Sequence, residues 1–313
     1  MKSNDYLYYK LNNYFQDTFG EKIYKISLDG GFTCPNRDGK VGIGGCIFCN
    51  ETGSGEFTEG KLTITNQINN QLKLIVKKFP HGQVIAYFQN FTNTYGDIEQ
   101  LRKVYNEALL HPRVIGIAIA TRPDCLGPEI IELLQELNEK TFLWIELGLQ
   151  TINEKVARII NRCYDNETFI QSAKILSHSK IKFVTHLIIG LPGEEANDPI
   201  KTALFAVKNL TWGIKIHSMY IDRNTKLHEL LLTGKYKPIT IDYYINKLIE
   251  IIQAIPSNIV VHRITGDPYK KTLVEPLWTA NKKAVLNEIH NKMKKEKIYQ
   301  GKVSEMYMNK NIL

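Results

Sequence analysis

Six short, strongly apolar segments alternate with amphipathic segments between about residue 20 and residue 255. Two of them, VIGIAIAT at Val114–Thr121 and FVTHLII at Phe183–Ile189, are almost entirely apolar, which is typical of parallel strands covered on both faces. We expect the other strands at Lys22–Leu28, Val84–Phe88, Phe142–Leu149 and Gly213–Tyr220. This succession of β/α units predicts an α/β fold with a parallel sheet, either doubly wound or an incomplete barrel.

The segments between these strands have helical periodicity. In Asp97–His111 the apolar residues recur on one face, and Asp97 stands where it can cap the first turn. We expect similar helices at Gly127–Asn138, Asn153–Asn161, Thr168–Ser177 and Asp198–Asn209. In α/β folds the chemistry lies at the carboxyl ends of the strands, so the polar and glycine-rich loops that follow them should share one face.

The pattern changes after Pro256 to one more strand at Asn258–Ile264 and then a basic helix. We therefore divide the chain into an N-terminal extension (1–20), a partial barrel (21–255) and a small C-terminal appendage (256–313). From Asn281 to Leu313 there are eight Lys and three Glu, a net charge of +5, whereas the other residues contribute only +3 of the total of +8. Such a segment is typical of a polyanion-binding surface or of a solvated lysine-rich helix.

Composition and segment lengths limit the class of protein. The 313 residues are 43% apolar and 23% charged, which excludes a disordered or collagen-like chain. The longest apolar stretches reach about a third of the ~20 residues that a membrane helix needs. The first 20 residues lack the ordered features of a secretion signal. We therefore expect a cytoplasmic protein that does not bind membranes.

Three of the five cysteines, Cys34, Cys46 and Cys49, lie in the glycine-rich segment GGFTCPNRDGKVGIGGCIFCN at residues 30–50. An odd number of cysteines in a reducing compartment argues against a disulfide framework. A structural zinc ion would need a fourth ligand, and the sequence has no other Cys or His between Lys2 and Phe79. Three thiolates suit a 4Fe–4S cluster with one open iron. The loop favours a cluster, with zinc or three unligated thiols as alternatives.

Several motifs follow one another along the chain: GGFTCPNRDG, GGCIFCN, AYFQNFTNTY, ATRPDC, ELGLQT, INR, THLIIGLPGE, GIKIH and VHRI. With these motifs the chain resembles the radical S-adenosylmethionine (SAM) superfamily, and within it the YhcC/YtqA-type proteins, a branch akin to Elp-type tRNA-modifying radical enzymes. The resemblance extends from Lys22 to about Lys282. The spacing C-x11-C-x2-C departs from the superfamily's usual C-x3-C-x2-C but fits this branch. Where relatives carry Arg-Gly-His, this chain has Arg162-Cys163-Tyr164.

The resemblance implies an enzyme with an incomplete (β/α)6 TIM-like barrel, a 4Fe–4S cluster on Cys34, Cys46 and Cys49, and SAM bound to the open iron. Reductive cleavage of SAM would give a 5′-deoxyadenosyl radical that abstracts a hydrogen atom. The reaction needs an electron donor such as flavodoxin or ferredoxin. Cys125 and Cys163 have no assigned role, and they are too few for the second cluster of a sulfur-inserting enzyme.

By their positions in these motifs, residues at the strand ends are expected to hold SAM. Glu146 and Gln150 alternate with apolar residues and should face the same side of one strand. A structural Glu146 paired with Arg122 is the alternative. The expected SAM-binding residues are Gln89, Thr92 and Asn93 for the amino group, Glu146 and Gln150 for the ribose and amino acid, Arg162 for the carboxylate, Gly190, Leu191 and Pro192 beside the adenine, and Thr121 at the end of its strand.

The substrate should lie near the last strands. Lys215, His217, His262 and Arg263 are the candidates, although each histidine can also be an ordinary core residue. The kinship to Elp-type enzymes, the net charge and the lysine-rich end together favour tRNA, with the C5 side chain of the wobble uridine as the target. The alternatives are a radical SAM enzyme acting on a small metabolite or protein, and a non-catalytic zinc-binding nucleic-acid adaptor.

Overall fold

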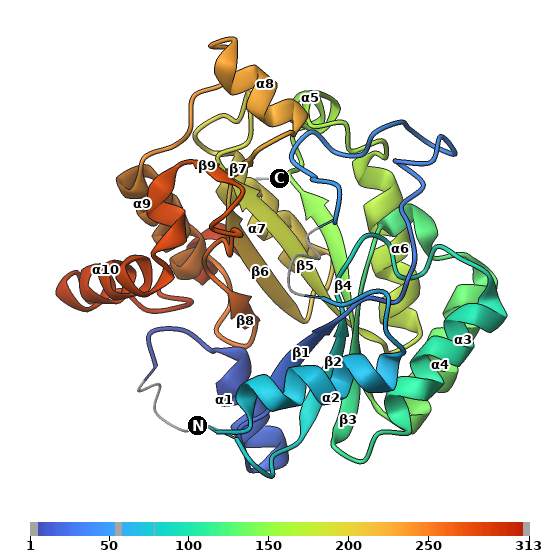
Figure 1. The fold of residues 1–313 in the computed structure, drawn as a ribbon. Coiled ribbons are helices and arrows are strands. Elements are labelled where there is room, and N and C mark those ends of the chain that lie inside the picture. The colour runs from blue at the N-terminus through green and yellow to red at the C-terminus, as the bar shows by residue number, and fades with distance from the viewer. Residues whose placement is uncertain (1–5, 54–57, 78, 309–313) are drawn as a thin grey trace.

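Seven parallel strands form an open half-barrel in a computed structural model that describes residues 6–53, 58–77 and 79–308 (Figure 1). Their order in the sheet is β1-β2-β3-β4-β5-β6-β8. The expected α/β partial barrel is therefore confirmed, with one strand more than the six units predicted. The strands are β1 (Tyr24–Leu28), β2 (Val84–Phe88), β3 (Val114–Thr121), β4 (Phe142–Gln150), β5 (Lys182–Ile189), β6 (Gly213–Ser218) and β8 (Val260–Arg263).

Helices cover the outer face of the sheet, as the apolar strands predicted. Leu143, Ile145 and Leu147 of β4 point outward into the core that the helices complete. The carboxylate of Asp97 accepts hydrogen bonds from the backbone N–H groups of Glu99 and Gln100, which confirms the expected cap. The outer helices are α2 (Ile64–Ile75), α3 (Ile98–Leu109), α4 (Pro128–Lys140), α6 (Asn166–His178), α7 (Asp198–Lys208) and α9 (Ile241–Ala254).

Helix α1 (Leu11–Phe19) fills one end of the barrel interior. Phe15 is buried with its ring 6.3 Å from Trp144, a residue of β4 that points inward. Lys10 also forms a parallel bridge with Val261 of β8. The segment that we expected as an extension therefore closes one end of the barrel, while residues 30–50 lie at the opposite end (Figure 1).

The last strand of the sheet lies in the segment that we expected to form an appendage. Gly213 of β6 pairs with Val260 of β8, so this strand extends the barrel, because the helix α9 returns the chain to the free edge of β6. The numerical domain boundaries stay predictions. The remaining elements are α5 (Glu154–Ile159), β7 (Ile221–Asp222), α8 (Lys226–Leu232), β9 (Leu273–Glu275), α10 (Lys282–Lys295), α11 (Ser304–Met308) and two short 3-10 turns at Pro123–Cys125 and Leu277–Ala280.

Helix α10 packs against α9 through one apolar face. Val285, Ile289 and Met293 are buried, whereas the lysines of this helix lie toward solvent. The basic helix expected from the sequence is therefore present and amphipathic. Among the described residues, no helix has both the length and the apolar character that crossing a membrane requires.

Candidate active site

A cavity of about 500 Å³ opens at the carboxyl ends of the strands, between the barrel and the cysteine loop. It brings together most of the residues that the sequence singled out. Five of the expected residues, all described by the structure, are not part of its lining: Asn93, Gly190, Leu191, Pro192 and His262. The expected residues that line it are Cys34, Cys46, Cys49, Gln89, Thr92, Thr121, Glu146, Gln150, Arg162, Lys215, His217 and Arg263.

The cysteine loop is held by backbone hydrogen bonds to two helices. The N–H of Ile47 donates to the carbonyl of Ile160 at the end of α5, and the N–H of Leu227 in α8 donates to Ile47. Gly44 and Gly45 both have φ of +80°, a conformation that costs little only for glycine. The glycines therefore let the loop turn sharply enough to present its thiols to the cavity.

The three thiols fit a cluster site. Cys46 and Cys49 are in hydrogen-bonding contact, and this contact lowers the pKa of the Cys49 thiol. The amide nitrogen of Asn36 lies 3.7 Å from the sulfur of Cys46. Within the described ranges, no three Cys, His, Asp or Glu side chains enclose a single ion, but a cubane binds each thiolate at a separate iron. Three soft thiolate donors facing one open cavity suit a 4Fe–4S cluster with an exchangeable corner.

Three buried side-chain oxygens in the loop after β2, those of Asn90, Thr92 and Asn93, lack a partner among the described residues, and of these three residues Thr92 lines the cavity. The hydroxyl of Thr92 is buried and has no hydrogen-bond partner among the residues described. Such an orphaned donor is available to a bound cofactor. Asn93 has a different place, because its side-chain amide donates to the carbonyls of Phe88 and Ala120. Asn93 thus holds the loop, and Thr92 faces the cavity.

Glu146 lies at the inner end of the cavity with its carboxylate fully buried. It contacts Lys25 at 2.8 Å, Lys215 at 2.6 Å and His186 at 2.8 Å, and the indole nitrogen of Trp144 lies 3.3 Å away. Four donors fill the four acceptor positions of a carboxylate. A bound SAM molecule would have to compete with these partners for Glu146.

Arg122, the alternative partner of Glu146, instead pairs with Asp124 at 2.7 Å. The positions of the two residues along their strands explain why Arg122 does not reach Glu146. Arg122 follows the end of β3, whereas the side chain of Glu146 lies deeper in the barrel, level with Lys25 and Lys215. The alternative pairing of Glu146 with Arg122 was therefore wrong. The expectation that Glu146 has structural partners was correct, but these partners are Lys25, Lys215 and His186.

Burial and charge perturb the titration of this group of side chains. Burial would raise the pKa of Glu146, but the charges of Lys215 and Lys25 hold it well below its usual range. Burial lowers the pKa of Lys215 to about 7, although Glu146 acts in the opposite direction. Burial, followed by the charge of Lys215, lowers the pKa of His186 to about 4. His186 is therefore neutral near pH 7 and donates one hydrogen bond to Glu146.

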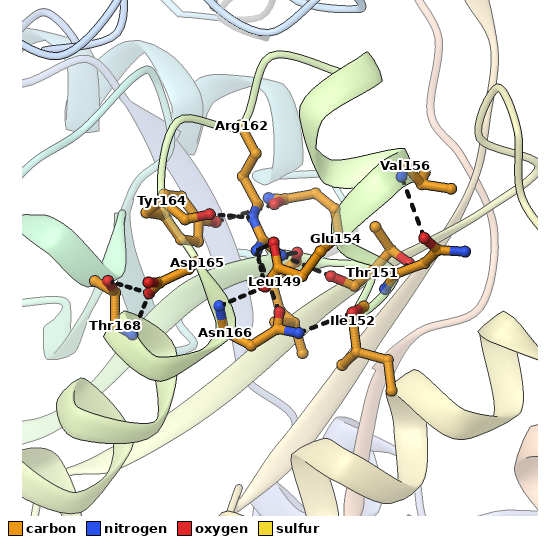
Figure 2. Close-up of polar contacts among 12 residues, drawn as sticks. Leu149, Thr151, Ile152, Glu154, Val156, Arg162, Tyr164, Asp165, Asn166 and Thr168 are labelled. Carbon is orange, nitrogen blue, oxygen red and sulfur yellow. Dashed lines mark hydrogen bonds and ion pairs between the residues drawn. The ribbon is translucent and has the colours of Figure 1, made fainter.

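Arg162 is fixed by the backbone around it (Figure 2). Its guanidinium donates to the carbonyls of Leu149 at 3.0 Å, Thr151 at 2.6 Å and Tyr164 at 2.9 Å, and it lies 3.4 Å from the carboxylate of Glu154. With 1% of its side chain exposed, Arg162 joins the end of β4 to the turn after α5. Little of the guanidinium is left for the SAM carboxylate that we expected it to bind.

Tyr164 was missed by the sequence reasoning. Its hydroxyl lies 3.0 Å from the side-chain oxygen of Gln150 and 3.0 Å from the carbonyl of Gly148, and it lines the cavity. The guanidinium of Arg122 lies 4.8 Å from its ring centre. Cys163, which precedes it, has φ of +60°, a left-handed conformation that glycine adopts without steric cost.

The turn after β5 lies outside the cavity lining. The N–H of Gly190 donates to the carboxylate of Glu194 at 3.0 Å, and its carbonyl accepts from Tyr236 at 2.6 Å. Ile188, two residues earlier, lines the cavity instead. The expected backbone contact between this turn and adenine is therefore not supported by the cavity, and it stays a prediction.

The substrate candidates divide into two groups. Lys215, His217 and Arg263 line the cavity, and Arg263 lies 3.3 Å from Asp267. His262 lies instead between aromatic rings, with its centroid 5.0 Å from that of Trp212, and neither ring nitrogen bonds to any described residue. The ring of His262 also lies 5.7 Å from that of the inward-pointing Trp144, so His262 is inside the barrel but beneath the cavity, among the aromatic side chains near α1.

Two further residues of the site were missed, Lys25 and His186. Lys25 is a charged residue between Tyr24 and Ile26 of β1, and His186 lies in the largely apolar strand β5. A charged or polar side chain at an inward position of a buried strand is the signal that could have identified them. Their common partner, Glu146, could be seen only in the folded barrel.

The half-barrel and its three-thiol loop define a cluster-binding α/β enzyme. The chain belongs to the radical SAM superfamily, because residues 34–206 match that family and residues 211–295 match the radical SAM C-terminal domain. YtqA of Bacillus subtilis (strain 168) is 40% identical over 299 residues, covering 94% of this chain and 92% of YtqA.

Two more distant proteins extend the comparison. The tRNA uridine(34) acetyltransferase of Methanocaldococcus jannaschii is 28% identical over 191 residues, which are 59% of this chain and 34% of that protein. The structure of Methanocaldococcus infernus Elp3, lacking residues 1–46, superimposes with a TM-score of 0.67 at 18% identity, covering 93% of this chain and 68% of Elp3. The latter likeness concerns the fold alone.

Because the chain belongs to this superfamily, its cofactors are those of the family. The protein is a radical SAM enzyme whose family uses a 4Fe–4S cluster and SAM, and such enzymes need a reductant. When both are bound, the cluster supplies the electron that cleaves SAM. This chain supplies the three thiols, the free hydroxyl of Thr92 and the closed inner end of the cavity around Glu146.

Proposed function

We propose that this radical SAM enzyme acts on tRNA and changes the side chain at C5 of the wobble uridine. The proposal rests on the positions of the basic residues of α10. Exposed lysines lie at the two ends of α10 and just after it: Lys282, Lys283, Lys294, Lys295 and Lys297. Exposed cations at both ends of one helix suit a phosphate backbone.

The positive potential continues beyond this helix. Burial, followed by the charge of Lys294, lowers the pKa of Lys10. Burial, followed by the charges of Lys10 and Lys294, lowers the pKa of His290. These groups from the two ends of the chain therefore lie close enough to repel one another. A polyanion would relieve this repulsion.

One distant relationship supports a nucleic-acid substrate. A relative that is 28% identical over 191 residues is named as a tRNA uridine(34) acetyltransferase. Trp278 adds nothing to this proposal, because its ring packs 5.4 Å from Tyr244 and its N–H lies 3.3 Å from the carbonyl of Ile239. We therefore assign the tRNA contact to lysines rather than to stacking on Trp278.

The first experiment measures tRNA binding to the full-length protein as a function of salt. Replacing Lys283, Lys294 and Lys295 by Gln should weaken binding and reduce the slope of log Kd against log salt by about 2–3. A matched control replaces three exposed lysines on other helices, Lys155, Lys174 and Lys208, and changes the net charge equally. Equal effects of the two triple variants would contradict a defined tRNA surface.

The second experiment examines the product. Nucleosides from the tRNA of a deletion strain should show an altered wobble uridine by mass spectrometry, and the wild-type gene should restore it. Unchanged tRNA nucleosides would favour the alternative of a small metabolite or protein substrate. The zinc-binding adaptor is set aside by membership of the radical SAM superfamily.

A further inference from the structure

Two lysines share one carboxylate in the interior of the barrel. Lys25 of β1 and Lys215 of β6 approach Glu146 from opposite sides, with 20% and 4% of their side chains exposed. Among the residues described, Glu146 is the one acidic group in ion-pair contact with either lysine. Buried charges are normally balanced by partners of opposite sign. One positive charge is therefore left over while both lysines are protonated, and burial lowers the pKa of both.

The neighbouring groups do not balance this charge. His186 and His217 face the same space, and for both burial and the charge of Lys215 lower the pKa, so they are neutral near pH 7. The hydroxyl of Tyr87 accepts a hydrogen bond from Lys215 at 2.9 Å and carries no charge. With Lys25 and Lys215 protonated, an excess of one positive charge therefore lies at the inner end of the cavity, and a bound anion would favour this protonated state.

The other acidic residues of the cavity wall are engaged elsewhere. Asp267 lies 3.3 Å from Arg263 and 3.1 Å from Lys282. Asp222 accepts hydrogen bonds from Asn50 and Thr272. Arg263 thus has a partner of its own, and it also contributes to the positive potential at Lys215.

We propose that the inner end of the cavity is an anion subsite, in which Lys215 and Arg263 bind a carboxylate of the substrate. Both residues line the cavity, so a ligand that enters from the cysteine loop can reach them. A surplus of a single positive charge matches a monoanion such as a carboxylate better than a phosphate dianion. This inference rests on the radical SAM reaction in the same cavity, but it does not require that the substrate is tRNA.

The carboxylate of SAM is the other possible source of this anion. The two sources differ in what removal of the charge would do. If the subsite serves the substrate, replacing Lys215 weakens binding of a carboxylate probe and leaves SAM affinity intact. If it serves SAM, the same replacement weakens SAM binding.

The test uses the full-length, cluster-loaded protein under anaerobic conditions, with calorimetry as the measurement. With saturating SAM, 5-carboxymethyluridine should bind at least about tenfold more tightly than its methyl ester, and acetate should bind more tightly than acetamide. Lys215→Met should abolish both preferences. Lys25→Met should reduce them as well, although Lys25 does not line the cavity, because it removes the surplus charge. Lys208→Met, on the exposed side of α7, is the control.

The possible results distinguish a substrate anion subsite from a SAM-binding role and from the proposed uridine substrate. Equal binding of acid and ester, and of acetate and acetamide, in the wild-type protein would overturn the anion subsite. Loss of SAM affinity by more than about tenfold in Lys215→Met would assign the subsite to SAM and also overturn the inference. A preference for acetate that depends on Lys215, without binding of either uridine, would support the subsite and contradict the proposed uridine substrate.

Discussion

The ammonium group of Lys215 lies 2.6 Å from the carboxylate of Glu146, although the two residues belong to strands that are not adjacent. Strand β5 lies between β4 and β6, and its residue His186 contacts the same carboxylate. Lys25 of β1, the strand at one edge of the sheet, also contacts this carboxylate. These contacts join four strands across the interior of the half-barrel, and their loss should affect stability.

The first prediction concerns pH. Because the pKa of His186 is about 4 in the folded protein and about 6.5 when unfolded, the unfolded chain takes up its proton first as the pH falls. The free energy of unfolding should therefore decrease between pH 6.5 and pH 4, with about 2 kcal/mol lost to this residue by pH 5. Glu146, whose pKa is lowered, adds a further loss only below its usual range.

Urea unfolding at several pH values checks this expectation. His186→Gln keeps a donor for Glu146 but cannot titrate. The slope of its free energy of unfolding against pH should therefore be smaller than that of the wild-type protein, by up to the slope that corresponds to one proton. His178→Gln, at an exposed position, should behave like the wild-type protein. The assignment to His186 is wrong if both variants have the same pH dependence.

The second prediction concerns Arg162. Arg162→Lys removes most of the fixed hydrogen bonds to the carbonyls of Leu149, Thr151 and Tyr164, because an ammonium group does not reproduce the planar fork of a guanidinium. We expect a loss of about 2–4 kcal/mol in the free energy of unfolding, with little change in SAM affinity once the protein is folded. Arg158→Lys, in the last turn of α5, is the control. A large loss of SAM affinity without loss of stability would restore the role in SAM binding.

The third prediction concerns the left-handed residue Cys163. Glycine adopts this conformation without the steric cost that other residues incur. Cys163→Gly should therefore be about 0.5–1 kcal/mol more stable than Cys163→Ala in urea unfolding. Equal stability of the two variants would mean that the turn relaxes when the thiol is removed.

The fourth prediction concerns the cluster. Replacing Cys34, Cys46 or Cys49 by Ala should remove most of the iron from anaerobically reconstituted protein, because two thiolates hold a cubane poorly. Cys125→Ala and Cys163→Ala should keep it. Iron analysis and the visible absorption spectrum measure the result. Iron loss in Cys125→Ala as complete as in Cys46→Ala would show that the ligand set was wrongly assigned.

The fifth prediction concerns Thr92. Thr92→Val removes the orphaned hydroxyl at nearly constant volume, so iron content should be unchanged while SAM binds about fivefold to tenfold more weakly. Thr94→Val is a control of the same type, because that hydroxyl already bonds to Thr121 and to the carbonyl of Cys125. It should lower stability more than SAM affinity. SAM affinity unchanged in Thr92→Val would show that this hydroxyl does not contact the cofactor.

The sequence alone determined most of the local structure. All seven sheet strands, the capped helix after Asp97 and the three-thiol loop were visible as patterns, although the last strand was assigned to the appendage and not to the barrel. Hydrophobic periodicity and glycine content act over a few residues. The motifs also determined the superfamily. Which residues point into the barrel followed from the alternation along each strand, as Glu146 and Gln150 illustrate.

The partners of those residues were decided only by the tertiary structure. Glu146 was expected to bind SAM or pair with Arg122, but closure of the sheet places it between Lys25 and Lys215, which are far from it in sequence. In the same way Arg162 became a structural residue, because the turn after α5 folds back over the end of β4. A pattern along the chain shows which side of a strand a side chain occupies, whereas its contact depends on the curvature and register that bring distant strands together.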